Sequence, residues 1–322
     1  MSEELNKPEL KPELKQEWQV ISTLVSSIQI EQRRSRRWGI FFKSLTFIFL
    51  FSVLAITMSG DDVETLSASN SHVAVVDVFG PIMTGTEASS ERLLPVLADA
   101  FAAPNAKAVL LNINSPGGSP VQAGILFDEL QLLKKSHPKI PLYAVIGDVG
   151  ASGAYYIAAA ADYIYADKAS TVGSIGVIAS GFGFDQLIDK LGVERRTYTA
   201  GGNKDFLDPF LPEKAKQKAM FEDLLDQVHQ QFITQVEIGR GERLVQHEDL
   251  YSGAVWHGER ALELGLIDGL GSLHSVARDT IGVTDLLWYS PEKSPLEEVM
   301  SELGAQTKTA IHWGLSQSLM IQ

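Results

Sequence analysis

The stretch from His72 to Ile146 constrains the fold most, because apolar segments with strand character and with helix character alternate along it. The expected strands are 72–79, 106–113 and 141–146, and the expected helix is 121–135. The last strand is continuously apolar, which is typical of a strand covered on both faces. A strand, a helix and a second strand in close succession favour a right-handed crossover in a parallel sheet. We therefore expect one α/β domain over residues 72–285.

Shorter elements are predicted beyond residue 146. They are strands at 163–165, 176–178 and 195–199, and helices at 185–191 and 213–239. With 45% hydrophobic and 21% charged residues, the chain has enough apolar side chains for a substantial core. This composition excludes disorder throughout the chain.

A long apolar run precedes this domain. Residues 38–58 contain a single charge, Lys43, and as a helix they would extend about 30 Å, the thickness of a bilayer's hydrocarbon core. Four arginines stand just before the run, and acidic residues follow it. Because positive residues stay on the cytoplasmic side, we expect a single transmembrane anchor with a cytoplasmic N-terminus. A buried core helix and a cleaved signal peptide are the alternatives.

The anchor divides the chain and its charge. The expected parts are a cytoplasmic leader (1–37), the anchor (38–58), a linker (59–71), the domain (72–285) and a C-terminal extension (286–322). Residues 1–60 carry 8 basic and 6 acidic side chains, so the total charge of -13 leaves -15 for the remainder. An acidic body argues against nucleic-acid binding. The chain has no cysteine, which excludes thiolate nucleophiles and disulfides.

Ser152 is the first candidate for chemistry. It lies in the run Gly150–Ala151–Ser152–Gly153, between a buried strand and a small-residue segment expected to be helical. Unpaired amides at a helix N-terminus stabilise the negative charge of a tetrahedral acyl intermediate, which favours a nucleophile there. A helix-capping serine is the commoner role for such a residue.

The loop Asn114–Ser115–Pro116–Gly117–Gly118 is the second candidate. It follows a predicted strand, and parallel strands present their C-terminal loops at one edge of the sheet. Two consecutive glycines leave backbone amides accessible to a ligand oxygen. A simple proline–glycine turn without a function is the alternative.

A nucleophilic serine needs a base, and the sequence offers two kinds. None of the seven histidines lies in a glycine-rich setting at the end of a strand. Lys204 follows a predicted strand in the loop 199–205, and a lysine acts as a base when its amine is desolvated and neutral. An exposed surface lysine is the alternative interpretation.

Several segments together resemble the signal peptide peptidase A family of membrane-associated serine peptidases, in its short bacterial form. The segments are GASGAYYIAAAAD (150–162), TVGSIGVI (171–178), GGNKDFLDP (201–209), NSPGG (114–118) and YSGAVWHGERALELGLIDGLG (251–271). The resemblance covers residues 73–271. It implies an α/β fold of the Clp protease and crotonase type, a spiral of ββα units.

The resemblance also implies a role for each matching residue. Ser152 matches the nucleophile and Lys204 the general base. Backbone amides of Gly117 or Gly118, together with Gly153, match the oxyanion donors. Ser174 matches a polar residue near the lysine amine. The family needs no metal or other cofactor, and it forms rings in which serine and lysine can come from different subunits.

The implied activity is hydrolysis of peptides at the membrane surface. Its substrates would be signal peptides left in the bilayer, and its location the bacterial inner membrane with the catalytic domain on the periplasmic side. Phe206, Leu207, Phe210 and Leu211 flank the lysine and are expected to keep it dry. A non-catalytic ring-forming scaffold and, less readily, a crotonase-like acyl-CoA enzyme are the alternatives.

Overall fold

The computed structural model describes residues 31–34, 36–52 and 70–291. The chain divides into two units, residues 1–64 and 65–322. In the first unit, residues 31–34 and 36–52 are helical, and Trp38 stacks on Phe42 with ring centroids 5.7 Å apart. Within the described ranges, no helix is both long enough and apolar enough to span a bilayer. Residues 53–58 of the predicted anchor lie outside those ranges.

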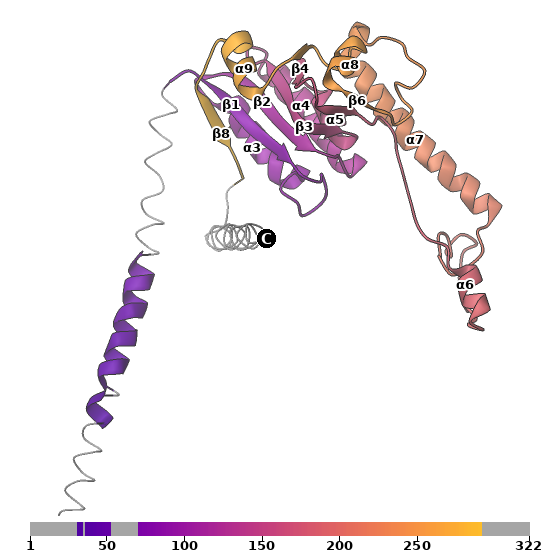
Figure 1. Cartoon of the computed structure of the whole chain (residues 1–322), viewed down its shortest axis with the longest axis horizontal. Helices are drawn as coiled ribbons and strands as arrows, with labels where there is room; N and C mark the ends of the chain where they lie inside the picture. The colour runs from indigo at the N-terminus through magenta and orange to yellow at the C-terminus, as the bar shows by residue number, and fades with distance from the viewer. Residues whose placement is uncertain (1–30, 35, 53–69, 292–322) are drawn as a thin grey trace, which may run out of the picture. The chain divides into compact units, whose positions relative to one another are not determined.

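The second unit is built on an eight-stranded sheet (Figure 1). Its strands are β1 His72–Phe79, β2 Ala106–Ser115, β3 Leu142–Ala151, β4 Tyr163–Ala166, β5 Thr171–Gly173, β6 Val255–His257, β7 Gly269–Leu270 and β8 Leu286–Tyr289. The strand order is β6-β5-β3-β2-β1-β8, with β4 paired to β3 and β7 paired to β4. Every pair is parallel except β5 with β6. The α/β class and the parallel β2–helix–β3 unit expected from the sequence are confirmed.

Helices connect and cover the strands. They are α3 Ser90–Ala102, α4 Pro120–Ser136, α5 Gly153–Ala158, α6 Asp185–Lys190, α7 Ala215–Arg240, α8 Gly258–Glu263 and α9 Leu273–Ser275, with short turns η1 Gly241–Arg243 and η2 Val276–Ile281. The predicted helices at 121–135, 185–191 and 213–239 correspond to α4, α6 and α7. Helix α3, strands β6 to β8 and the short helices after α7 were not predicted from the sequence.

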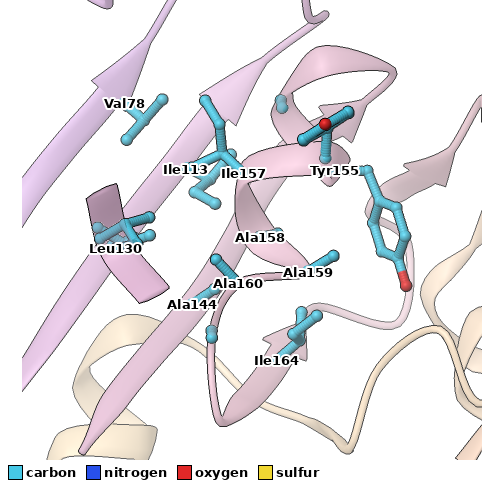
Figure 2. Close-up of a cluster of buried hydrophobic side chains, with 14 of the residues drawn as sticks. Val78, Ile113, Leu130, Ala144, Tyr155, Ile157, Ala158, Ala159, Ala160 and Ile164 are labelled. Carbon is cyan, nitrogen blue, oxygen red and sulfur yellow. The ribbon is translucent and has the colours of Figure 1, made fainter. Parts of the chain in front are cut away.

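Two apolar layers hold the sheet. Alternate residues of β1 to β3, such as Val76, Leu111 and Ala144, face α3, α4 and α5 in the larger cluster. Figure 2 shows Ile113, Leu130 and Ile157 packed together around α5 in this layer. The residues between them face the segment that contains α9 and η2. This period of two is what apolar strands buried on both faces require.

Two predicted strands are wrong. Residues 176–178 and 195–199 have no strand geometry, and the strand near the first of them is β5, Thr171–Gly173. Neither segment pairs with a strand among the described residues, and most side chains between 177 and 214 are exposed. The sheet also continues past residue 285, because β8 pairs with β1. Residues 292–322 of the expected C-terminal extension lie outside the described ranges.

Candidate active site

Ser152 lies at a sharp turn between β3 and α5. Its backbone angles are φ 54° and ψ -126°, a combination that residues with a Cβ rarely adopt because the side chain crowds the backbone. Strain of this kind persists only where the surrounding structure imposes it, and it concentrates at functional sites. A strained strand-to-helix turn is also the device by which the unrelated α/β-hydrolases expose a nucleophilic serine.

The hydroxyl of Ser152 does not cap the helix that follows. Its side chain accepts no capping hydrogen bond, although the residue occupies the N-cap position of α5. Its backbone N–H donates to the carbonyl oxygen of Gly173 at 2.8 Å, and its own carbonyl accepts from Tyr156 at 2.9 Å. The backbone is therefore fixed while the half-buried hydroxyl has no hydrogen-bond partner among the described residues. The capping interpretation of Ser152 is wrong.

The glycine loop after β2 packs directly on this turn. A Cβ atom at Gly117 would lie 2.7 Å from the Gly153 nitrogen and 2.8 Å from Cβ of Ser152, and Gly117 has φ 93°. No residue with a side chain fits there. A Cβ atom at Gly153 would in turn lie 3.3 Å from the Gly118 nitrogen. The two glycine-containing segments thus approach closely enough for their amides to serve one ligand.

The amides of the three candidate oxyanion donors differ in their partners. The Gly117 N–H donates to Oγ of Ser115 at 3.1 Å. Within the described ranges, the N–H groups of Gly118 and Gly153 have no acceptor. Unpartnered amides next to a serine hydroxyl are suited to an oxyanion. The geometry therefore favours Gly118 with Gly153 over Gly117.

Ser174 lies beside the same turn. It follows β5, whose Gly173 pairs with Ala151, and its N–H donates to the carbonyl of Ala254 at 2.7 Å. Its φ of 51° is again positive. Leu207, three residues after Lys204, has the only other positive φ among the non-glycine residues that the structure describes. All three strained residues therefore fall on the segments that the sequence analysis selected.

Lys204 is not brought to Ser152 within one chain. Its side chain is exposed, and its loop contacts the first turns of α7, where Gln217 donates to the carbonyl of Gly202 and to Asp205. α5 instead packs on the second half of α7, where Phe232 stacks on Tyr156 at 4.9 Å. Fifteen positions of helix separate Gln217 from Phe232, on the order of 22 Å. Figure 1 likewise shows α6, the helix that precedes the lysine loop, far from α5.

The segment that carries Lys204, residues 177–214, is here named the arm. Its internal contacts include the stacking of Phe184 on Phe210 at 5.6 Å and the pairing of Arg195 with Asp208 at 3.1 Å. Its large apolar side chains are largely exposed, and they include Ile178, Phe182, Leu187, Leu191, Val193, Tyr198 and Leu207. In the single chain the apolar residues around Lys204 therefore do not keep it dry, contrary to expectation.

His229 on α7 contacts the segment that follows Ser174. Its Nε2 lies 3.1 Å from the carbonyl oxygen of Ile175, the residue after Ser174. A carbonyl only accepts, so this nitrogen carries the proton and the contact is structural. His229 therefore offers no basic nitrogen to Ser152 through this atom.

A buried ion pair between Arg240 and Asp268 lies close to the segment that α5 contacts through Tyr155. Arg240 is 1% exposed and binds Asp268 through both terminal nitrogens, at 2.8 and 3.0 Å. Asp268 also accepts from the Ile164 N–H at 2.7 Å. Burial raises the pKa of Asp268, but the bonds from Arg240 and Ile164 outweigh it, so the pKa lies below its usual value. Tyr155, three residues after Ser152, donates to the carbonyl of Leu266 at 2.7 Å.

Sequence reasoning missed this support, although part of its signal was visible. Asp268 stands in the LIDGLG run that carries the resemblance, but Arg240 belongs to no motif. Two further side chains, Asn114 and Ser170, bind the backbone just before Ser152. Among the described residues, no three histidine, aspartate or glutamate side chains converge as metal ligands.

Comparison with known proteins places the chain in a family. The model of peptidase family S49 matches residues 134–281, which include Ser152, Ser174 and Lys204. A putative protease of Synechocystis is 31% identical over 209 residues, a match that covers 64% of this chain and 72% of that protein. The chain belongs to peptidase family S49. The family recognised from the sequence motifs is thereby confirmed.

Two other relatives show how far the likeness extends. A putative signal peptide peptidase SppA of Enterococcus faecium is 35% identical over 165 residues, covering 51% of this chain and 47% of that protein. A Brucella abortus protein named Na(+)/H(+) antiporter NhaA is 44% identical over 220 residues, covering 67% of this chain. The match covers only 30% of the Brucella protein. The chain spans less than half of either relative.

Proposed function

We propose that this S49 family member is a serine endopeptidase in which Ser152 is the nucleophile and Lys204 the general base. The observation that carries the proposal is the turn at Ser152. Its strained backbone holds a hydroxyl that makes no capping hydrogen bond beside the unpartnered amides of Gly118 and Gly153. A folded protein keeps such strain and such unpaired amides at a site that binds a developing charge.

The proposed reaction is acyl transfer in two halves. The neutral amine of Lys204 takes the proton of the Ser152 hydroxyl while Oγ bonds to the peptide carbonyl carbon. The oxyanion accepts hydrogen bonds from Gly118 and Gly153. As the C–N bond breaks, the proton passes to the leaving amine. Lys204 then deprotonates a water, which releases the acyl group and restores Ser152.

A second copy of the chain completes the site in this proposal. The loop of Lys204 contacts the first turns of α7, too far from α5 for the lysine to reach Ser152 of its own chain, and it belongs to the arm with its exposed apolar side chains. Ile178 and Tyr198 are 88% and 91% exposed in the single chain. Burying such residues against a neighbour favours association. A homo-oligomeric ring would place the arm of one copy over Ser152 of the next and desolvate the lysine.

We propose that the substrates are apolar peptides, signal peptides among them, cleaved at a membrane surface. Support comes from the apolar run at 38–58 and from the name of the Enterococcus relative. The proposed location is the bacterial inner membrane, with residues 1–37 cytoplasmic and the S49 unit periplasmic. We assign the fold to the Clp protease and crotonase type.

The test measures cleavage of an apolar fluorogenic peptide by the full-length detergent-solubilised protein. Ser152→Ala and Lys204→Ala are each expected to lower kcat by about 1,000-fold or more, because the two groups act as a unit. Lys190→Ala is the matched control, since Lys190 lies on the arm but outside the Lys204 loop. Lys204→Ala at the parent rate would show that Lys204 is not the base.

Mixing the two inactive variants tests the shared site. If serine and lysine come from different copies, hetero-oligomers of Ser152→Ala with Lys204→Ala contain some intact sites and regain activity. We expect at most about a quarter of the parent rate for random equal mixing in which each site draws on two copies. No recovery from oligomers shown by mass to be mixed would contradict a shared site. A scaffold without activity would be indicated if the parent oligomer cleaved nothing.

A further inference from the structure

β3 is irregular just before Ser152. Its register with β2 runs evenly to Ile113 opposite Ile146, and then jumps so that Ser115 lies opposite Gly150. Two steps along β2 thus correspond to four along β3. The extra length is a bulge formed by Gly147, Asp148 and Val149. Bulges bend a strand and re-aim the side chains that follow.

The bulge is tightly folded. A Cβ atom at Gly150 would lie 2.7 Å from Cγ2 of Ile146, so the chain turns back over that side chain. From Val149 to Ala151, β3 then pairs with β5, and Ser152 follows at once. The direction in which the Ser152 turn leaves the sheet therefore depends on the shape of the bulge.

The side chain of Asn114 holds the bulge from the β2 side. Its Oδ1 accepts from the Val149 N–H at 3.2 Å, and its Nδ2 donates to Oδ2 of Asp148 at 3.2 Å. The two bonds use opposite ends of the amide, so the contact with Asp148 fixes which end faces Val149.

Ser170 holds the bulge from the opposite side. Its hydroxyl donates to the carbonyl of Gly147 at 2.5 Å and accepts from the Asp167 N–H at 2.9 Å. Ser170 is 2% exposed, so water does not compete for these bonds. Two backbone groups of the bulge, the Val149 N–H and the Gly147 carbonyl, are thus bound by the side chains of Asn114 and Ser170.

We propose that Asn114 and Ser170 are positioning residues for the Ser152 nucleophile. They act through the backbone of the bulge, which aims Ser152 toward the amides of Gly118 and Gly153, and they do not touch the substrate. The inference rests on the proposed function of Ser152. It predicts that loosening the bulge slows acyl transfer while substrate binding is retained.

A regular pair in the same sheet provides a matched control. Asn112, two residues before Asn114 on the same strand, donates to Asp77 on β1 at 2.8 Å. This bond has the same chemistry as that between Asn114 and Asp148, but it crosses an even part of the ladder. If substitution at either asparagine lowers the rate, the cause is a general loss of stability. If only substitution at Asn114 lowers the rate, the cause is the change in the bulge.

The central test exchanges the two ends of the Asn114–Asp148 bond. Asn114→Asp places two carboxylates face to face and is expected to lower kcat and the rate of fluorophosphonate labelling by about 10- to 100-fold, with KM unchanged. Adding Asp148→Asn restores one donor and one acceptor, and most of the lost rate should return. Asn112→Asp, which faces Asp77 in the same way, should leave kcat unchanged.

A second variant covers the case in which Asn114→Asp does not fold. Asp148 is exposed, so Asp148→Ala leaves the core intact and removes only the bond that orients Asn114. We expect a labelling rate lowered by about 3- to 10-fold, with the melting temperature of the parent.

The inference is overturned if Asn114→Asp and Asp148→Ala label at the parent rate, or if the exchanged pair shows no recovery. Its failure is distinguishable from that of the proposed function. Labelling that persists in Ser152→Ala would reject the nucleophile itself. Labelling that needs Ser152 but ignores Asn114 and Asp148 would reject only the positioning role.

Discussion

The backbone nitrogen of Gly118 lies 3.3 Å from the point where a side chain on Gly153 would begin. This approach joins the loop after β2 to the first residue of α5 and leaves two N–H groups without acceptors beside Ser152. In Gly153→Ala the added methyl group must displace the Gly118 amide. We expect kcat to fall by at least about tenfold, given the cost of losing an oxyanion donor. Unchanged kcat would place the oxyanion elsewhere.

The strain at Ser152 predicts a difference in stability between two inactive variants. Ser152→Gly and Ser152→Ala both lack the nucleophile, but only glycine adopts φ 54° without a steric cost. We expect the free energy of unfolding of Ser152→Gly to exceed that of Ser152→Ala by about 1 kcal/mol. Urea unfolding measures the difference. If the alanine variant were as stable as the glycine variant, the turn would carry no strain.

The Arg240–Asp268 pair is predicted to be important for stability. Arg240→Met leaves the Asp268 carboxylate without its main partner inside the protein, and we expect a loss of about 3–5 kcal/mol in the free energy of unfolding. Arg278→Met is the control, because Arg278 pairs with Asp279 on the surface, where solvent screening leaves an ion pair little effect on stability. Equal losses in the two variants would contradict the role of burial.

The same pair gives stability a pH dependence of known sign. The folded-state pKa of Asp268 lies below its unfolded value of 3.8, so its contribution is complete above that value and is lost as the pH falls through the folded pKa. Asp268→Asn is therefore expected to be less stable at pH 7 and to lose less stability than the parent as the pH falls below about 5. Parallel stability curves for the two proteins would contradict this assignment.

The exposed face of the arm predicts an effect on assembly. Tyr198 is 91% exposed in the single chain, so it contributes little to the packing of that chain. Tyr198→Asp should leave the melting temperature of the dissociated chain unchanged. Because a charge in an apolar interface is costly, the variant should lower the mass of the assembly and its turnover together. A variant that assembles normally would show that this part of the arm lies outside the interface.

The strands and helices with regular periodicity were predictable from the sequence. Residues 72–79 form a short valine-rich run typical of a strand, and residues 213–239 show a helical period over a long stretch; β1 and α7 match them. The strand expected at 141–146 continues to Ala151, because the bulge at Gly147–Val149 interrupts the apolar run without ending the strand. The pattern at 195–199 resembles a strand, but pairing needs a neighbour that the arm does not have.

The site was predictable where its chemistry is local. Ser152 and the glycines lie in short motifs, since a tight turn and close backbone approach demand glycine at fixed positions. The separation of Lys204 from Ser152 was not predictable, because it depends on how far α7 extends beyond the core. The roles of Asn114 and Ser170 depend on a register jump that the residue types do not encode.

The identity of the nucleophile is tested most directly by locating a fluorophosphonate on the assembled full-length protein. Peptide mass spectrometry of the labelled oligomer should find one phosphonate per reactive chain, on Ser152. The adduct should be absent from Ser152→Ala and strongly reduced in Lys204→Ala. A phosphonate on any other residue, or an oligomer that cleaves peptides while Ser152 stays unmodified, would contradict the account.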